Sequence, residues 1–276
     1  MSLVVGIIET NISPFARLGC KNLGYLQFQI LGMSNLFLFG LLVVLMLLAQ
    51  FASAKTADEV VERYIVTCGG LEKLANVKSI YLEAVTQEGA EAPTIIIIKE
   101  QNKFCRTEMI KAAENAFLLI TEKGAWAFSA QGQNFAEEIS NEKIARLQLQ
   151  LDIMGPLVDY LAKGHMVVMM GKEVLEENSC FKIKLTTKSG VELLFWLDAK
   201  TYMIKQSSFS EAGSQAMLTQ TFYKNYTEVD GIKFAQTIIT RVSSSNQVQR
   251  EEELFFKKIL LNPAIDSTIY QPNNQL

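Results

Sequence analysis

Residues 217–241 read MLTQTFYKNYTEVDGIKFAQTIITR, with Asp230-Gly231 between two runs rich in β-branched and aromatic residues. Runs of this composition favour strands, and an Asp-Gly pair favours a turn. The stretch therefore predicts two successive strands, near residues 217–225 and 232–241, joined by a short turn.

The same pattern extends outward from this stretch in both directions. Further strands are expected from Lys78 onward and at residues 95–98, 104–111, 116–121, 165–170, 180–187, 192–197, 204–210 and 252–259, and Lys123-Gly124 leads into Trp126-Ala127-Phe128. Residues 95–98 are four isoleucines, apolar on both faces, which favours a strand that is covered on both sides. We expect a mainly β (α+β) fold of about ten or eleven strands in meander order. An antiparallel sheet of this length usually curls toward a barrel.

Two stretches break the strand pattern with helical spacing. Thr56-Ala57-Asp58-Glu59 is a capping box, and it predicts a helix that ends at Gly69-Gly70. A short further turn of helix is expected at residues 71–75. A second helix is expected to begin near Ser140-Asn141 and to break at Gly155-Pro156, with a shorter helix over residues 157–161.

The first 54 residues carry the features of a secretory leader. Leu36–Ala49 is an apolar run too short to span a bilayer, and Ala52-Ser53-Ala54 is an A-x-A cleavage pattern. Cleavage near Ala54 would release residues 55–276 as a soluble periplasmic domain, and an uncleaved membrane anchor is the alternative. The start codon is open between Met1 and Met33.

The charge of the exported part limits its classes of partner, and its cysteine count limits its disulfides. Without Arg17, Lys21 and Glu9, the 26 basic and 29 acidic residues fall to 24 and 28, a net charge of about −4. That balance argues against nucleic acid or anionic lipid as a partner held by electrostatic attraction. Three cysteines follow the leader: Cys68, Cys105 and Cys180. Buried thiols are expected, with a Cys105–Cys180 bridge as the alternative.

The exported part shows no pattern typical of an enzyme. His165 is its one histidine, and no zinc-binding, nucleophile-elbow or phosphate-loop motif occurs. We therefore expect no catalytic residues, no metal and no cofactor. A hydrolase of envelope substrates would need carboxylates or hydroxyls that the fold assembles in one cleft.

Large apolar side chains on the expected strands admit two interpretations. In one interpretation they form a packed core. In the other, some of them line a cavity for acyl chains, since a curled sheet of this size can enclose a ligand. The candidates for such a cavity are Ile97, Phe104, Met109, Leu119, Trp126, Phe128, Ile183, Phe195 and Met217. Composition does not decide between these interpretations.

Six stretches together carry a resemblance to a known family. They are residues 64–74 (YIVTCGGLEKL), 155–165 (GPLVDYLAKGH), 171–174 with 180–185 (GKEV, CFKIKL), 197–202 (LDAKTY), 223–226 with 229–234 (YKNY, VDGIKF), and Asn262-Pro263 with Ile265-Asp266 and Ile269-Tyr270. In this order they resemble the LolA/LolB-like (lipoprotein localisation factor) superfamily, in particular its outer-membrane lipoprotein-sorting branch. The resemblance covers nearly all of residues 58–272.

This resemblance implies an incomplete, strongly curved antiparallel β-barrel, with helices as a lid over an apolar cavity for lipid or lipoprotein acyl chains. The lid candidates are Ile144, Leu147, Leu151, Met154 and Leu157. The lipoprotein carriers have an arginine, tied to the lid, just before the Pro-Asn turn of an early strand. This sequence reads Lys99-Glu100-Gln101-Asn102 there, with neither the arginine nor the proline. The lid-locking role of that arginine is therefore not carried over.

The sequence thus predicts a non-enzymatic periplasmic carrier or binding protein for lipid or lipoprotein acyl chains, linked to outer-membrane lipoprotein sorting. We expect a monomer that meets an inner- or outer-membrane partner protein. The alternative is a non-enzymatic envelope interaction module that shares the fold but has a filled core.

Overall fold

The structure is a computed structural model that describes residues 55–86, 92–111, 115–129, 133–138, 141–211, 217–245 and 247–266. Apart from Lys55, they belong to one compact unit, Thr56–Leu276. The predicted leader, its cleavage near Ala54 and the alternative start at Met33 lie outside the described residues. Within the described ranges, no helix is long and apolar enough to cross a membrane.

The described strands form a single antiparallel sheet. They are β1 (Ser79–Thr86), β2 (Thr94–Glu100), β3 (Phe104–Ile110), β4 (Ala116–Thr121), β5 (Gly124–Ser129), β6 (Gln133–Glu138), β7 (Met166–Leu175), β8 (Asn178–Thr186), β9 (Glu192–Asp198), β10 (Ile204–Glu211), β11 (Met217–Val229), β12 (Ile232–Ser244) and β13 (Gln247–Leu261). Their order is β6-β5-β4-β3-β2-β1-β13-β12-β11-β10-β9-β8-β7. Two meanders, β1–β6 and β7–β13, therefore meet where β1 pairs with β13.

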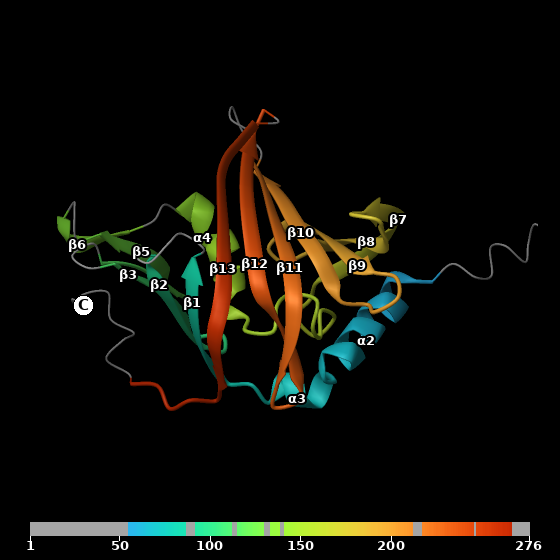
Figure 1. Cartoon of the computed structure of the whole chain (residues 1–276), viewed down its shortest axis with the longest axis horizontal. Coiled ribbons are helices and arrows are strands. Elements are labelled where there is room, and N and C mark those ends of the chain that lie inside the picture. The colour runs from blue at the N-terminus through green and yellow to red at the C-terminus, as the bar shows by residue number, and fades with distance from the viewer. Residues whose placement is uncertain are drawn as a thin grey trace, which may run out of the picture. The chain divides into compact units, whose positions relative to one another are not determined.

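The sheet is open, because its outermost strands β6 and β7 do not pair with each other. The long strands β11, β12 and β13 stand at the front of Figure 1, with β1–β6 on one side and β7–β9 on the other. The mainly β fold predicted from the sequence, an incomplete and strongly curved antiparallel barrel with covering helices, is confirmed. The number of strands is larger than expected, thirteen among the described residues.

Two helices precede the sheet as the capping and glycine signals predicted. Helix α2 (Ala57–Cys68) has the complete capping box of Thr56 and Glu59, and α3 (Leu71–Ala75) follows the double glycine. Gly69 has a positive φ of 132°, and a Cβ there would lie 2.4 Å from the carbonyl oxygen of Gly231. Only glycine therefore allows the end of α2 to approach the β11–β12 turn so closely.

A segment between the two meanders fills the curve of the sheet. It contains α4 (Asn141–Leu147) and the 3-10 helix η2 (Gln148–Leu151). The two meanders form two wings of the sheet, β1–β6 and β7–β13. Leu151 packs with Cys105 and Ile120 on the first wing, whereas Leu157 packs with Ile183 and other side chains of the second wing. One short segment reaches both wings because the sheet curves around it. The short helix predicted over residues 157–161 is wrong: these residues form turns, and Asp159 has a positive φ of 51°.

Both faces of the early strands are covered, as the four isoleucines predicted. Ile97 packs on the concave face with the clusters around Cys105 and around Ala84, whereas Ile98 packs on the outer face. The outer cluster contains Phe104 and is completed by Ile265 from the end of the described chain.

Candidate functional site

A cavity of about 370 Å³ lies between the concave face of the sheet, the helices α2 and α3, and residues 149–158. Its walls are made by Tyr64, Cys68, Leu74, Leu82, Lys99, Leu149, Gln150, Asp152, Ile153, Met154, Gly155, Pro156, Leu157, Val158, Phe195, Ile204, Tyr223, Tyr226, Ile232, Lys233, Phe234, Ala235, Ile238, Phe256 and Ile259. Most of these side chains are apolar. The volume falls at the lower end of ligand pockets, which span about 300–1,000 Å³.

The floor of the cavity follows from the strand register. Leu82 on β1 lies opposite Ile259 on β13, and Ala84 lies opposite Phe256. Residues directly opposite each other on paired strands point to the same face. These apolar side chains therefore share the concave face, and Ile238 of β12 joins the same cluster.

The segment that roofs the cavity is fastened to the β2–β3 turn. The backbone amide of Ile153 donates to Gln101 Oε1 at 2.8 Å, and Gln101 Nε2 donates to Asp152 Oδ1 at 3.2 Å. The amide of Asn102 also donates to the carbonyl of Leu151 at 2.9 Å. These bonds provide a tie between lid and strand turn without an arginine at residues 99–102.

Two further contacts hold this segment from its other side. Lys163 Nζ pairs with Asp152 Oδ2 at 2.6 Å and donates to the carbonyl of Gly155. Tyr160 donates its hydroxyl to Asp58 Oδ1 of α2 at 2.6 Å. The carboxylate of Asp152 is thus fully engaged inside the protein.

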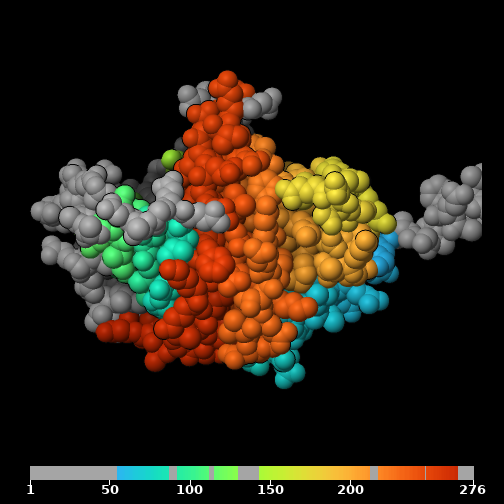
Figure 2. All heavy atoms as spheres, in the orientation of Figure 1, coloured from blue at the N-terminus to red at the C-terminus, as the bar shows by residue number. Residues whose placement is uncertain are grey.

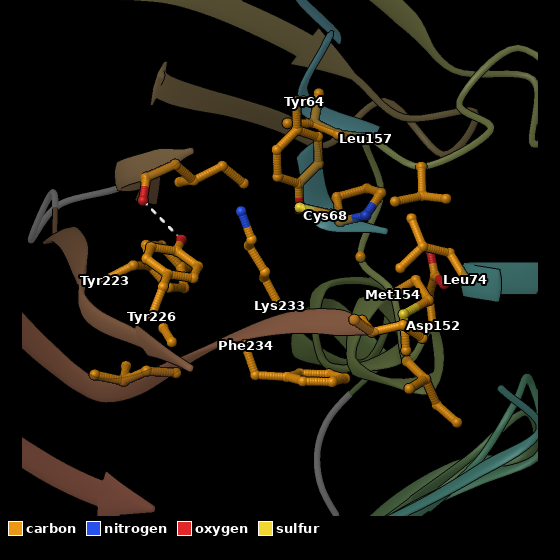
Figure 3. Close-up of a pocket in the computed structure, with 18 of the residues that line it drawn as sticks. Tyr64, Cys68, Leu74, Asp152, Met154, Leu157, Tyr223, Tyr226, Lys233 and Phe234 are labelled. Carbon is orange, nitrogen blue, oxygen red and sulfur yellow. Dashed lines mark hydrogen bonds between the residues drawn. The ribbon is translucent and has the colours of Figure 1, made fainter. Parts of the chain in front are cut away.

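Three tyrosines and one cysteine bring polar groups into the apolar wall (Figure 3). Tyr226 donates to the carbonyl of Ile204 at 2.8 Å, and the Tyr223 hydroxyl lies 3.0 Å from Ser207 Oγ. Burial raises the pKa of all three tyrosines above the ordinary value, Tyr64 included. Burial likewise raises the pKa of the Cys68 thiol to about 11. These groups are therefore uncharged at neutral pH.

Two lysines also line the cavity. Lys99 of β2 lies opposite Ile80 on one neighbouring strand and Cys105 on the other, so its side chain starts on the concave face. Lys233 of β12 is exposed, and its side chain extends between the tyrosine pair and Cys68 (Figure 3). Neither ammonium forms an ion pair with a carboxylate of the described chain.

The lining offers few groups for proton transfer or attack. Asp152 is the one carboxylate among the lining residues, which include no histidine, serine or threonine. Across the part of the chain that the structure describes, no three His, Cys, Asp or Glu side chains gather as metal ligands would. His165 lies outside the cavity, where its Nδ1 accepts from the amide of Lys188 at 3.1 Å.

Only some of the residues predicted to line a cavity lie at this cavity or beside it. Phe195 lines it, and Ile183 lies beside Phe195 on β8, buried in the core that contains Leu157. Ile97 and Met109 pack on the concave face next to the floor, and Met217 is partly buried at the start of β11. Phe104, Leu119, Trp126 and Phe128 lie in the outer cluster instead and do not line this cavity.

The predicted lid residues lie on the segment that covers the concave face. Met154 and Leu157 line the cavity, and Leu151 packs under the same segment with Leu147 at its side. Ile144 is partly exposed on α4. The cavity therefore meets the carboxyl-terminal half of the predicted lid.

Sequence reasoning missed Tyr64, Tyr226 and Lys233 as cavity residues. Tyr64 lies one helical turn before Cys68 on α2, within the YIVTCGGLEKL stretch. Tyr226 and Lys233 belong to the YKNY and VDGIKF stretches. Membership of the stretches that carry the family resemblance was the available signal, although it did not show to which face of the sheet these side chains point.

All three described cysteines are free and buried. The Cys105–Cys180 bridge held open from the sequence is wrong, because β3 and β8 belong to different wings of the sheet. Cys105 instead contacts Gln150 Oε1, and Cys180 contacts the carbonyl of Asn178.

No protein family and no curated protein matches the chain. Among solved structures, a DUF1329 family protein from Desulfovibrio piger aligns with a TM-score of 0.53 at 11% identity, covering 79% of this chain and 98% of that one. A LolA superfamily protein from Nitrosomonas europaea aligns with a TM-score of 0.50 at 13% identity, with coverage of 79% and 98%. At these identities the likeness concerns the fold, and the chain has a LolA-like fold.

Proposed function

We propose that this protein is a non-enzymatic carrier that holds the acyl chain of a lipid or lipoprotein in the cavity beneath residues 149–158. The observation that carries the proposal is an apolar cavity of about 370 Å³ between a curved sheet and a covering segment. Burying alkyl chain from water contributes about 0.8 kcal/mol per methylene. Transfer of a few methylenes into this cavity would therefore supply useful affinity.

The setting of this activity is proposed on sequence grounds. Removal of the leader near Ala54 would place the domain in the periplasm as a soluble monomer, where carriage between membranes would serve outer-membrane lipoprotein sorting. A membrane partner protein would load or receive the cargo. The lining residues include no histidine, serine or threonine, and this composition supports a role in binding rather than catalysis.

The decisive experiment combines native mass spectrometry without detergent and uptake of a fluorescent fatty acid. Ala235 lines the cavity, whereas its neighbour Gln236 does not, so Ala235→Phe should fill the cavity and Gln236→Phe is the matched control. We expect lipid bound to the wild type and to Gln236→Phe, and a large loss in Ala235→Phe. Folding of each variant is checked by circular dichroism. Consistent absence of lipid and of uptake in the folded wild type would refute the carrier.

One observation favours a second function, an envelope interaction module. Strand β7 is an edge of the sheet, and Met166, Val168, Met170 and Val174 on it are more than half exposed. The β7–β8 hairpin lies at the surface in Figure 2, coloured yellow. An exposed apolar edge can accept a strand from another protein. The exposed edge of β7 is the observation that favours this alternative.

A charge placed on the edge tests this second function. Val168→Lys should abolish capture of a protein partner, whereas Val66→Lys, at an exposed valine on helix α2, should not. Capture that survives Val168→Lys would exclude β7 as the interaction surface. Capture of a protein partner, together with negative lipid assays on this protein, would favour the interaction module over the carrier.

A further inference from the structure

We propose that the cavity selects amphiphiles with an anionic headgroup, a carboxylate or a phosphate, and that Lys233 pairs with that headgroup. This inference rests on the proposed carrier function and specifies its ligand. Its basis is a mismatch of charge. The chain as a whole is acidic, with 26 basic and 29 acidic residues, yet the cavity wall carries two lysines that form no ion pair with any described carboxylate.

The single carboxylate in the wall does not neutralise these lysines. Asp152 is already bound by Lys163 through Oδ2 and by Gln101 through Oδ1. The pair of Asp152 and Lys163 is neutral, so Lys99 and Lys233 leave the wall with an excess of positive charge. The tyrosine hydroxyls add no negative charge, since burial raises each pKa.

Lys233 is the better placed of the two for a headgroup. It is exposed, and Glu228, which lies directly opposite on β11, does not form an ion pair with it in the described structure. Its side chain reaches back toward Cys68 and Tyr64 (Figure 3). The positive charge of Lys233 lowers the pKa of Cys68 against the larger effect of burial, which agrees with that position. An anion at Lys233 would thus stand beside apolar wall on one side and solvent on the other.

Lys99 occupies a different position. It is partly buried on the concave face, and it shares the lining with Asp152 and Gln150 of the covering segment. A partly buried ammonium without a carboxylate partner favours the approach of an anion. Lys99 should therefore add a longer-range attraction, whereas Lys233 makes the direct contact.

Cavity size limits the hydrophobic part of the ligand. A volume of about 370 Å³ is small for a binding pocket, so one acyl chain at a time is expected. The ligand is accordingly an anionic amphiphile of which one chain is enclosed and the headgroup stays at the exposed lysine.

The test compares an acid with its neutral ester. Dansylaminoundecanoic acid and its methyl ester are titrated into the wild type, Lys233→Gln, Lys233→Arg, Lys99→Gln and the control Lys200→Gln, an exposed lysine outside the cavity. We expect the wild type to prefer the acid by about ten-fold, which corresponds to about 1.4 kcal/mol. The preference should vanish in Lys233→Gln, fall by less in Lys99→Gln, and persist in Lys233→Arg and Lys200→Gln.

The outcomes separate this inference from the carrier function. Equal binding of acid and ester by the wild type would overturn the headgroup site and leave the carrier intact, whereas binding of neither probe would overturn both. Preference retained in Lys233→Gln would overturn the role of Lys233. Displacement of the acid probe by lauric acid or by monododecyl phosphate, with dodecanol as the neutral competitor, distinguishes a carboxylate from a phosphate headgroup.

Discussion

The backbone amide of Ile153 and the side-chain Oε1 of Gln101 are joined by a hydrogen bond of 2.8 Å, which links the roof of the cavity to the β2–β3 turn. The same glutamine donates through Nε2 to Asp152, the neighbour of Ile153. One side chain thus satisfies two groups of the covering segment. In the proposed carrier, release of a bound chain would require this segment to move, and Gln101 would then control the exchange of ligand.

Replacing Gln101 by alanine should loosen the roof. Loss of a partner for a partly buried amide costs about 1–3 kcal/mol, so we expect a fall of this size in unfolding free energy. Hydrogen exchange at the Ile153 amide should also accelerate. Gln249→Ala is the control, because that exposed glutamine donates only to the carbonyl of Gln247. Unchanged exchange at Ile153 would show that Gln101 does not hold the segment.

The sequence predicted the fold better than the site, and particular residues show why. The Thr56–Glu59 capping box, Gly69-Gly70 and the Asp230-Gly231 turn are local signals, and each one is confirmed. The face of the sheet to which a side chain points is not determined by local signals. Phe104 and Cys105 are adjacent and both buried, yet they face opposite sides, and the pattern of residues alone did not say which side enclosed the cavity.

The cavity residues that were missed depend on contacts between distant parts of the chain. Lys233 follows a turn in a strand of mixed composition, and only the fold brings α2 and its Cys68 near to it. The arginine of the lipoprotein carriers is absent from residues 99–102, and in this structure Gln101 joins the β2–β3 turn to the covering segment. A hydrogen bond between residues about 50 positions apart leaves no signal in the local sequence pattern.

Leu157 should contribute to stability far more than Leu161 on the same segment. Leu157 is 2% exposed and packs against Val60 and Ile183, whereas Leu161 is 72% exposed. Leu157→Ala should lower the unfolding free energy by about 2–5 kcal/mol, since it deletes buried methyl groups and leaves a void. Leu161→Ala should stay within about 0.5 kcal/mol. Urea denaturation measures both, and equal effects would contradict the packing of this segment against α2.

The contact of Tyr160 with Asp58 should make stability depend on pH in the alkaline range. Burial, with the nearby Asp58 carboxylate, raises the pKa of Tyr160 to about 12. The folded protein thus retains this proton more tightly than the unfolded chain, whose tyrosines ionise near pH 10. The stabilisation is complete below pH 10 and is lost as the pH rises from 10 to 12.

Tyr160→Phe isolates this contribution from that of the other buried tyrosines. The wild type should be more stable than the variant at pH 8, and the difference should shrink between pH 10 and 12. Urea midpoints at pH 8, 10 and 11.5 measure the change. A difference that stays constant with pH would mean that the Tyr160 hydroxyl is not held in its neutral form by the fold.

The position of Cys68 in the cavity wall predicts how its thiol should react. Thiolate is the reactive form, and the pKa of about 11 leaves little of it at neutral pH, so alkylation of the native protein should be slow. A small apolar maleimide should still reach Cys68 before Cys105 and Cys180, which are buried but do not line the cavity. Bound fatty acid should slow that reaction further, because it occupies the path to the sulfur. Mass spectrometry of peptides after timed labelling gives the order, and Cys68→Ser should remove the fast site. If Cys105 or Cys180 is labelled first, or if fatty acid has no effect on Cys68, the cavity is not open to ligands at this wall.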